Sequence, residues 1–207
     1  MTCFADSDAI FKLAALDLLD EFVGVIGIER GSILVLPTLP YMLRKPGRSL
    51  IRKYSADALG RAFDFVKTVC VADDEPDSET RILLQGIDNI DPGEALIFAL
   101  AAFKPDSIIV TGDKRCLRAL HNAPECDIVR ERLAGRVICL EHILHEICRI
   151  HEFEPLLARI VPAAGCDTMI QAVFGSGMRA QKHLVLGSLH NYRESLRAET
   201  GLLLCPP

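Results

Sequence analysis

The sequence predicts an α/β protein with a parallel central sheet flanked by helices and a mostly helical segment at its C-terminal end. Short apolar runs of strand length occur at residues 2–6, 33–36, 108–111 and 136–140. Longer stretches with helical spacing separate them, and this alternation is typical of a parallel sheet. The composition agrees with a folded globular chain, because half of the 207 residues are apolar and 25% are charged.

The first part of the chain alternates strand-like and helical segments. Residues 2–6 predict a strand and residues 8–22 a helix, because apolar side chains recur there at helical spacing. The run at residues 33–36 has the length and β-branched content of a buried strand, and a short helix is expected after it. One or two helices are expected between residues 49 and 71. The acid-rich run at residues 73–77 predicts a solvated loop.

The remaining elements follow the same alternation. They are expected, in chain order, as a short helix at 81–87, a helix at 94–103, a strand at 108–111, a helix at 114–121, a strand at 136–140 and a helix at 141–153. We expect residues 1–150 to form one α/β domain. Residues 151–207 are expected to form a helical C-terminal extension, with breaks at 162–165 and 175–177. No role for this extension can be derived from its residues.

Composition limits the class of protein. The net charge is −5 and the isoelectric point about 5.7, so any contact with a polyanion must be local. The eight cysteines form no CxxC pair, which predicts reduced thiols in a cytoplasmic protein. The longest apolar run, residues 95–103, is far shorter than the ~20 residues that span a bilayer. We therefore expect no membrane segment.

Three carboxylates occupy positions where an α/β chain presents metal ligands. Asp6 follows the first strand, Asp113 follows the strand at 108–111, and Glu94 begins the preceding helix. Because the carboxyl ends of parallel strands converge on one crevice, these side chains are expected to meet there. Each acid taken singly also fits a helix cap, and Glu94 fits a capping box with Asp91. The combination, more than any one acid, predicts a divalent-metal phosphodiesterase.

The order of these motifs resembles the PIN-like nuclease family. The matching stretches are FADSDAIFKL at residues 4–13, DPGEALIFALA at 91–101 and IVTGDKR at 109–115. The resemblance implies a parallel-sheet domain with an acidic pocket that binds Mg²⁺ or Mn²⁺ and hydrolyses phosphodiester bonds, usually in single-stranded RNA. It also implies that Asp6, Glu94 and Asp113 are the catalytic residues. Hard oxygen ligands suit these metals, which activate a water and stabilise charge on phosphoryl oxygens.

The chain departs from the family at one point. The family usually has another acid a few residues after the second strand, whereas residues 36–43 contain none. Either Asp8 substitutes as a fourth metal ligand, or metal binding is weakened. On a strand Asp8 would share the face of Asp6, but in a helix it would point away. The main alternative to a ribonuclease is therefore a catalytically degenerate PIN-like domain that binds RNA or a protein.

Basic residues supply candidates for substrate binding. Six basic residues and one acid lie between residues 44 and 61, and among them Arg48, Arg52 and Lys53 are expected to contact a phosphate backbone. An ordinary solvated helix face is the alternative. Lys114 and Arg115, directly after Asp113, are expected at the scissile phosphate. Single-stranded RNA is the expected partner, while a protein inhibitor and a homo-oligomer stay open.

Two further patterns have weaker support. His142, His145, Cys148 and His151 recur every three residues, but each step drifts around a helix, so four such side chains cannot converge on one zinc ion. The run Asp6-Ser7-Asp8 also resembles the nucleophile and acid of a haloacid-dehalogenase-like phosphatase, with Asp113 as its magnesium ligand. That family's motif usually continues with Gly-Thr, which this chain lacks.

Overall fold

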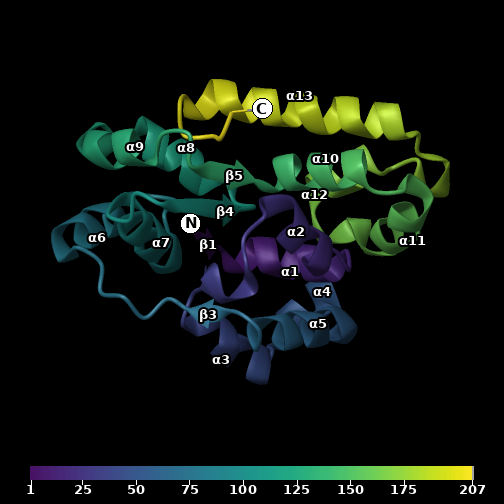
Figure 1. Cartoon of the computed structure of the whole chain (residues 1–207), viewed down its shortest axis with the longest axis horizontal. Coiled ribbons are helices and arrows are strands. Elements are labelled where there is room, and N and C mark those ends of the chain that lie inside the picture. The colour runs from purple at the N-terminus through teal and green to yellow at the C-terminus, as the bar shows by residue number, and fades with distance from the viewer. Residues whose placement is uncertain (207) are drawn as a thin grey trace.

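A five-stranded, all-parallel sheet forms the centre of the computed structural model, which describes residues 1–206 (Figure 1). The spatial order of the strands is β3-β2-β1-β4-β5. Their bounds are β1 (Thr2–Ala5), β2 (Ile33–Val35), β3 (Cys70–Val71), β4 (Ser107–Thr111) and β5 (Val137–Cys139). Helices flank this sheet, so the predicted α/β class is confirmed.

The strand order creates a switch point between β1 and β4. From β1 the chain adds β2 and β3 on one side of the sheet, and then crosses back to add β4 and β5 on the other side. Ala5 at the end of β1 is in register with both Val35 of β2 and Val110 of β4. At such a point the connections after the two strands diverge and leave a crevice at their carboxyl ends.

The helices lie between and around the strands. They are, in chain order, α1 (Ser7–Ala15), α2 (Leu19–Ile26), α3 (Thr38–Arg44), α4 (Arg48–Tyr54), α5 (Ala56–Val66), α6 (Ser78–Gln85), α7 (Pro92–Ala102), α8 (Lys114–Asn122), α9 (Asp127–Leu133), α10 (Leu140–Ile150), α11 (Phe153–Ala163), α12 (Thr168–Val173) and α13 (Lys182–Thr200). Short 3-10 turns occur at Arg30–Ser32, Pro124–Cys126, Ala164–Cys166 and Gly177–Arg179. In residues 1–206, no helix has the length and apolarity needed to cross a membrane.

Two hydrophobic cores cover the two faces of the sheet. Successive strand residues point to opposite faces. Cys3, Ala5 and Val110 face the core that contains α1, α2, α5 and α10. Phe4 and Ile109 face the core that contains α7, α8 and α9. Because both faces are covered, the interiors of β1 and β4 are continuously apolar rather than alternating with polar residues, and polar residues occur only at their ends.

Three elements differ from the sequence prediction. The single helix expected at 8–22 is wrong, because the chain turns at Asp17, whose φ is +57°, and this turn separates α1 from α2. Strand β3 is only two exposed residues long, which is too short to show a period. Helix α9 was not predicted either. Its buried residues Val129 and Leu133 are four positions apart, a single repeat that gives little periodic signal.

The C-terminal residues pack onto the sheet domain. Helices α11 and α12 and the first half of α13 bury side chains such as Ile160, Ile170 and Leu189 in the first core. The end of α13 and the chain after it bury Leu196 and Leu204 in the second. Leu204 also forms a parallel bridge with β5. In Figure 1, α13 lies along α10 at the edge of the molecule. The extension therefore completes both cores.

We predict that the folding of the sheet domain depends on α13. Leu189→Ala removes a fully buried side chain and should lower the free energy of unfolding by about 2–5 kcal/mol. The matched control is Leu184→Ala on the same helix, where the side chain is 58% exposed and the expected change is below about 0.5 kcal/mol. Urea unfolding followed by circular dichroism measures both. Equal effects of the two variants would show that α13 is not part of the cooperative core.

Candidate active site

Asp6 lies at the carboxyl end of β1, directly before α1. Its backbone amide donates to the carbonyl of Val110 at 2.9 Å, which extends the sheet by one residue. Asp6 occupies the N-cap position of α1, yet its side chain makes no cap hydrogen bond. Instead the hydroxyl of Thr111 donates to Asp6 Oδ2 at 3.2 Å. The hydroxyl of Thr111 at the sheet edge thus holds the Asp6 carboxylate, which does not cap α1.

Burial strongly perturbs Asp6. The side chain is buried at the sheet edge, and this burial, together with the charges of Asp8 and Asp91, raises the pKa of Asp6 to about 7. The hydrogen bond from Thr111 acts in the opposite direction but is outweighed. A carboxylate in this state gains more from a nearby cation than an exposed one does.

Glu94 belongs to the first turn of α7, and Pro92 begins that helix. Asp91 Oδ1 accepts from the amide of Glu94 at 2.8 Å, and Glu94 Oε2 accepts from the amide of Asp91 at 2.8 Å. This is a complete capping box. Burial, followed by the charge of Asp91, raises the pKa of Glu94 to about 7. The capping alternative is therefore correct for Glu94, and the same contacts fix its carboxylate at the cleft.

Asp113 caps α8 and is held by Arg115. Asp113 Oδ1 accepts from the amide of Arg115 at 2.7 Å, and the guanidinium lies 2.6 Å from Oδ2. Burial by itself would raise the pKa of Asp113, but the hydrogen bonds and charge of Arg115 outweigh it and lower the pKa. The pKa of Asp113 is thus lowered, whereas the pKa values of Asp6 and Glu94 are raised to about 7.

These acids share one cleft at the carboxyl edge of the sheet. The cleft has a volume of about 460 Å³. Five carboxylates line it, namely Asp6, Asp8, Asp91, Glu94 and Asp113. Leu36, Thr38 and Met42 form the wall that follows β2, so the segment that lacks an acid does border the cleft. The structure therefore brings together the three acids selected from the sequence, together with Asp91, which the sequence identified only as a cap.

Asp8 is occupied by other groups. It lies in the first turn of α1 rather than on the strand. Lys12 Nζ lies 2.5 Å from Asp8 Oδ2, and the hydroxyl of Tyr54 donates to Oδ1 at 3.0 Å. Lys53 Nζ lies 3.7 Å from the same oxygen. Both carboxylate oxygens of Asp8 thus have partners within the protein, and the missing acid after β2 has no free substitute there.

Lys12 joins the site to the C-terminal extension. Its buried amine also pairs with Asp167 Oδ2 at 2.7 Å, and Asp167 caps α12. Burial would lower the pKa of Lys12, but Asp8 and Asp167 outweigh it and raise the pKa. The amine also faces Gly112, where an added Cβ would lie 2.8 Å from Asp8 Oδ2. A larger residue at position 112 would therefore displace the side chains of this ion cluster.

The basic residues selected from the sequence are dispersed. Lys53 and Arg115 line the cleft, whereas Arg48 and Arg52 are exposed on α4 outside it. Lys114 pairs with the fully buried Glu141 and lies over the ring of Tyr192, 5.3 Å from its centre. That pairing holds it against α10 and α13.

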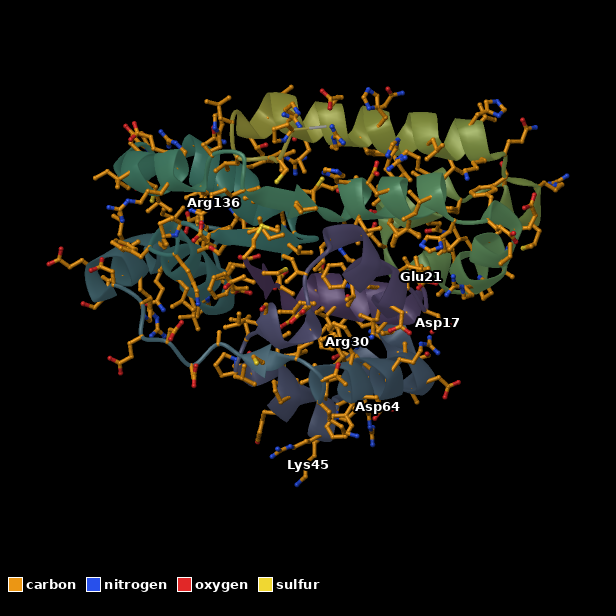
Figure 2. All side chains as sticks on the ribbon, viewed as in Figure 1. Asp17, Glu21, Arg30, Lys45, Asp64 and Arg136 are labelled. Carbon is orange, nitrogen blue, oxygen red and sulfur yellow. The ribbon has the colours of Figure 1, made fainter. Side chains whose placement is uncertain are left out.

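The rest of the basic segment points outward. Lys45 projects into solvent at the margin of the molecule (Figure 2). Arg61, in contrast, donates to the carbonyl of Ala14 at 2.9 Å and pairs with Asp17. Arg52, Lys53 and Arg61 of this segment line a neighbouring pocket together, and Lys53 is the member that also lines the acidic cleft.

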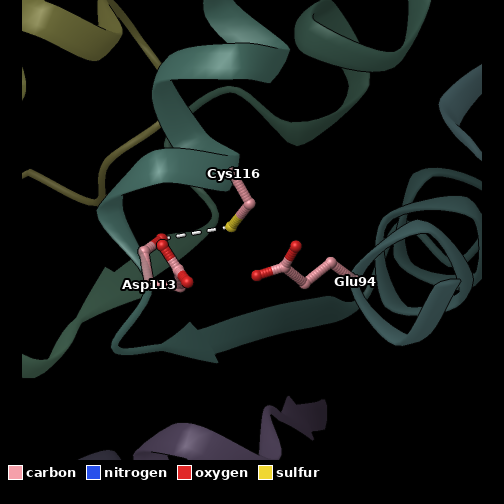
Figure 3. Close-up of side chains that lie close together, drawn as sticks. All are labelled: Glu94, Asp113 and Cys116. Atoms are coloured by element: carbon pink, nitrogen blue, oxygen red, sulfur yellow. Dashed lines mark hydrogen bonds between the residues drawn. The ribbon is translucent and has the colours of Figure 1, made fainter. Parts of the chain in front are cut away.

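A thiol beside the acids was not identified from the sequence. Cys116 is fully buried in the first turn of α8, and its Sγ donates to the carbonyl of Asp113 at 3.1 Å (Figure 3). Glu94, Asp113 and Cys116 each place one ligand atom within 4.8 Å of the others. The i, i+3 spacing from Asp113 to Cys116 was the available signal. Within residues 1–206 this is the one such group, and the histidines of α10 form none.

The fold and site define a class: an α/β protein with a parallel sheet and a carboxylate cluster at its switch point. Comparisons of the chain with protein-family models, with curated proteins and with solved structures gave no significant match. The functional argument therefore depends on the site itself.

The raised pKa of Asp6 predicts a pH-dependent cost in stability. Unfolded Asp has a pKa near 3.8, and folded Asp6 titrates at about 7. Between these values the folded state retains a proton that the unfolded state has lost, so the free energy of unfolding falls as pH rises from about 4 to 7 and stays low above 7. Asp6→Asn removes this cost. In EDTA the variant should match the wild type at pH 4 and exceed it by about 2–4 kcal/mol at pH 8.

Two controls accompany this experiment. Asp57→Asn changes an exposed acid and should leave the profile unchanged. Asp113→Asn should act in the opposite direction, because a lowered pKa gives stability that is present at neutral pH and lost as pH falls. Urea unfolding at pH 4, 6 and 8 measures all variants. Parallel profiles for Asp6→Asn and the wild type would contradict the assigned perturbation.

We predict that Lys12 is a major stabilising cation. Lys12→Met leaves Asp8 and Asp167 without their shared partner and should lower the free energy of unfolding by about 3 kcal/mol. Asp167→Asn in the same chain should restore part of that loss, because one uncompensated charge is then removed. Lys67→Met, at an exposed pair with Asp64, is the control and should cost less than about 1 kcal/mol. A double variant no better than Lys12→Met would rule out the coupling.

Proposed function

We propose that this protein is a metal-dependent endoribonuclease, and that Asp6, Glu94 and Asp113 hold Mg²⁺ or Mn²⁺ for hydrolysis of phosphodiester bonds in single-stranded RNA. The observation that carries the proposal is the shared cleft at the β1–β4 switch point. Three acids separated by up to 107 residues in the sequence line it together. The resemblance of their motifs to PIN-like nucleases supports the same assignment.

The donor set fits a hard divalent ion. All three residues offer carboxylate oxygens, which are the ligands that Mg²⁺ and Mn²⁺ prefer. Burial and repulsion from neighbouring carboxylates raise the pKa values of Asp6 and Glu94, and a bound cation would relieve both costs. When bound, such an ion supplies an activated water and neutralises charge on the phosphoryl oxygens.

The protein's own groups would perform the remaining tasks. Thr111 orients Asp6 by its hydrogen bond, and the capping box orients Glu94. Arg115 lines the cleft, and its side chain is 75% exposed. We assign it to a phosphate oxygen of the substrate, for which its guanidinium would leave Asp113. Lys53 lines the same cleft from α4 and is assigned to an adjacent phosphate of the strand.

We place this activity in the cytoplasm, where eight unpaired thiols would stay reduced. Single-stranded RNA is the proposed partner. A protein inhibitor that covers the acidic cleft, or self-association of the chain, would add regulation.

A second candidate is a degenerate PIN-like domain that binds RNA without cutting it. The observation that favours it is the wall after β2, where residues 36–43 offer no acid and Asp8 is held by Lys12 and Tyr54. A haloacid-dehalogenase-like phosphatase gains no support from the geometry, because its expected acid is this same engaged Asp8.

The deciding experiment is cleavage of a labelled single-stranded RNA with Mn²⁺, Mg²⁺ or EDTA. We predict metal-dependent cutting that falls by about a hundredfold or more in Asp6→Asn and in Asp113→Asn, since each removes charge stabilisation at the reacting phosphate. Asp57→Asn, prepared identically, is the control for contaminating nuclease. Binding of RNA by folded protein without any cutting would replace the nuclease with the degenerate domain.

A further inference from the structure

The thiol of Cys116 changes the chemistry of the acidic site. Figure 3 shows Glu94, Asp113 and Cys116 with their polar atoms turned toward one another. All three ligand atoms lie within 4.8 Å of each other. Ligand atoms of a tetrahedral zinc site are about 3.5 Å apart, given bonds of 2.0–2.3 Å. Small side-chain rotations would therefore close this group around one ion.

Backbone structure fixes all three side chains. Asp113 is the N-cap of α8 and Cys116 lies three residues further on, so both belong to the same first turn. Glu94 approaches from the first turn of α7. Glu94 is buried to more than nine-tenths, and its one backbone hydrogen bond uses Oε2. Its carboxylate is otherwise aimed at the other two ligands (Figure 3).

We propose that Glu94, Asp113 and Cys116 form a site for a thiophilic divalent ion of the zinc class. Three protein ligands with a fourth position toward the cleft are typical of zinc sites that exchange their ligands. Mg²⁺ has no preference for sulfur, whereas Zn²⁺ and Co²⁺ accept a mixed set of thiolate and carboxylate ligands. The thiol therefore selects a different class of metal from the one that Asp6, Glu94 and Asp113 select.

Two costs oppose binding. Arg115 must release Asp113, but the guanidinium is 75% exposed and such pairs contribute about 1 kcal/mol or less. The thiol must lose its proton to solvent as the sulfur–metal bond forms. Because binding releases this proton, it should strengthen as pH rises.

The site gives a form of regulation that depends on the proposed nuclease. A zinc-class ion would occupy Glu94 and Asp113, two of the three carboxylates assigned to Mg²⁺ or Mn²⁺. It would thereby stop hydrolysis. Metal binding itself does not depend on nuclease activity, and so the two proposals can be tested separately.

Cobalt titration tests the site directly. Co²⁺ bound to a thiolate gives a near-ultraviolet charge-transfer band, and the full-length protein should show this band saturating at one equivalent of CoCl₂. Cys116→Ser should abolish it. Cys148→Ser, which alters another fully buried helical thiol, should retain it. Zn²⁺ should erase the band in the wild type and Mg²⁺ should not. If Cys116→Ser is unfolded by circular dichroism, Cys116→Ala takes its place.

The outcomes separate the two proposals. A band that survives in folded Cys116→Ser, or no band in the wild type, overturns the thiophilic site. If the band behaves as expected, Zn²⁺ should inhibit Mn²⁺-dependent RNA cleavage, and Cys116→Ser should require roughly tenfold or more Zn²⁺ for the same inhibition. A cobalt band in a protein that never cleaves RNA would retain the metal site and remove the nuclease.

Discussion

The crowding of acids at one sheet edge is the constraint on which the rest of the structure depends. Five carboxylates line a single cleft, and they are Asp6, Asp8, Asp91, Glu94 and Asp113. Like charges gathered in one cleft repel one another and oppose folding unless they are compensated. The fold compensates them in two ways. Asp91 and Asp113 accept amides at helix N-termini, where the helix dipole favours negative charge. Cations provide the second form of compensation, because Lys12 and Lys53 pair with Asp8 and Arg115 pairs with Asp113.

That second form of compensation links the C-terminal residues to the site. Lys12 is buried and serves both Asp8 and Asp167, and Asp167 comes from the segment between α11 and α12. The same segment fills the core behind α1. Asp8 is therefore linked to residues beyond 150 in two ways, through the amine of Lys12 and through a shared apolar core. The C-terminal extension, to which the sequence assigned no role, thus stabilises helix α1 by packing against it and by pairing with Lys12.

The sequence predicted what depends on local pattern and strand order. Asp6 and Asp113 could be assigned to one cleft because each ends an apolar run, and parallel strands present their carboxyl ends together. Contacts that cross the fold could not be predicted. The spacing of Lys12 and Asp167 does not indicate that they form an ion pair. In the sequence Cys116 is one of eight scattered thiols, and only the folded position of α8 shows that it lies beside Glu94. The direction of Asp8 depended on whether α1 begins at Ser7, which a boundary prediction cannot fix.

The cleft is chemically asymmetric, and this asymmetry decides where an ion can bind. The wall after β2 offers Leu36, Thr38 and Met42, none of which is a carboxylate. The part of the lining built from the first turns of α7 and α8 carries Glu94 and Asp113, and the thiol of Cys116 lies within 4.8 Å of both. An ion would therefore be drawn toward α7 and α8 and away from Met42. Sulfur and oxygen ligands lie together there, and this is the arrangement on which the proposed thiophilic site rests.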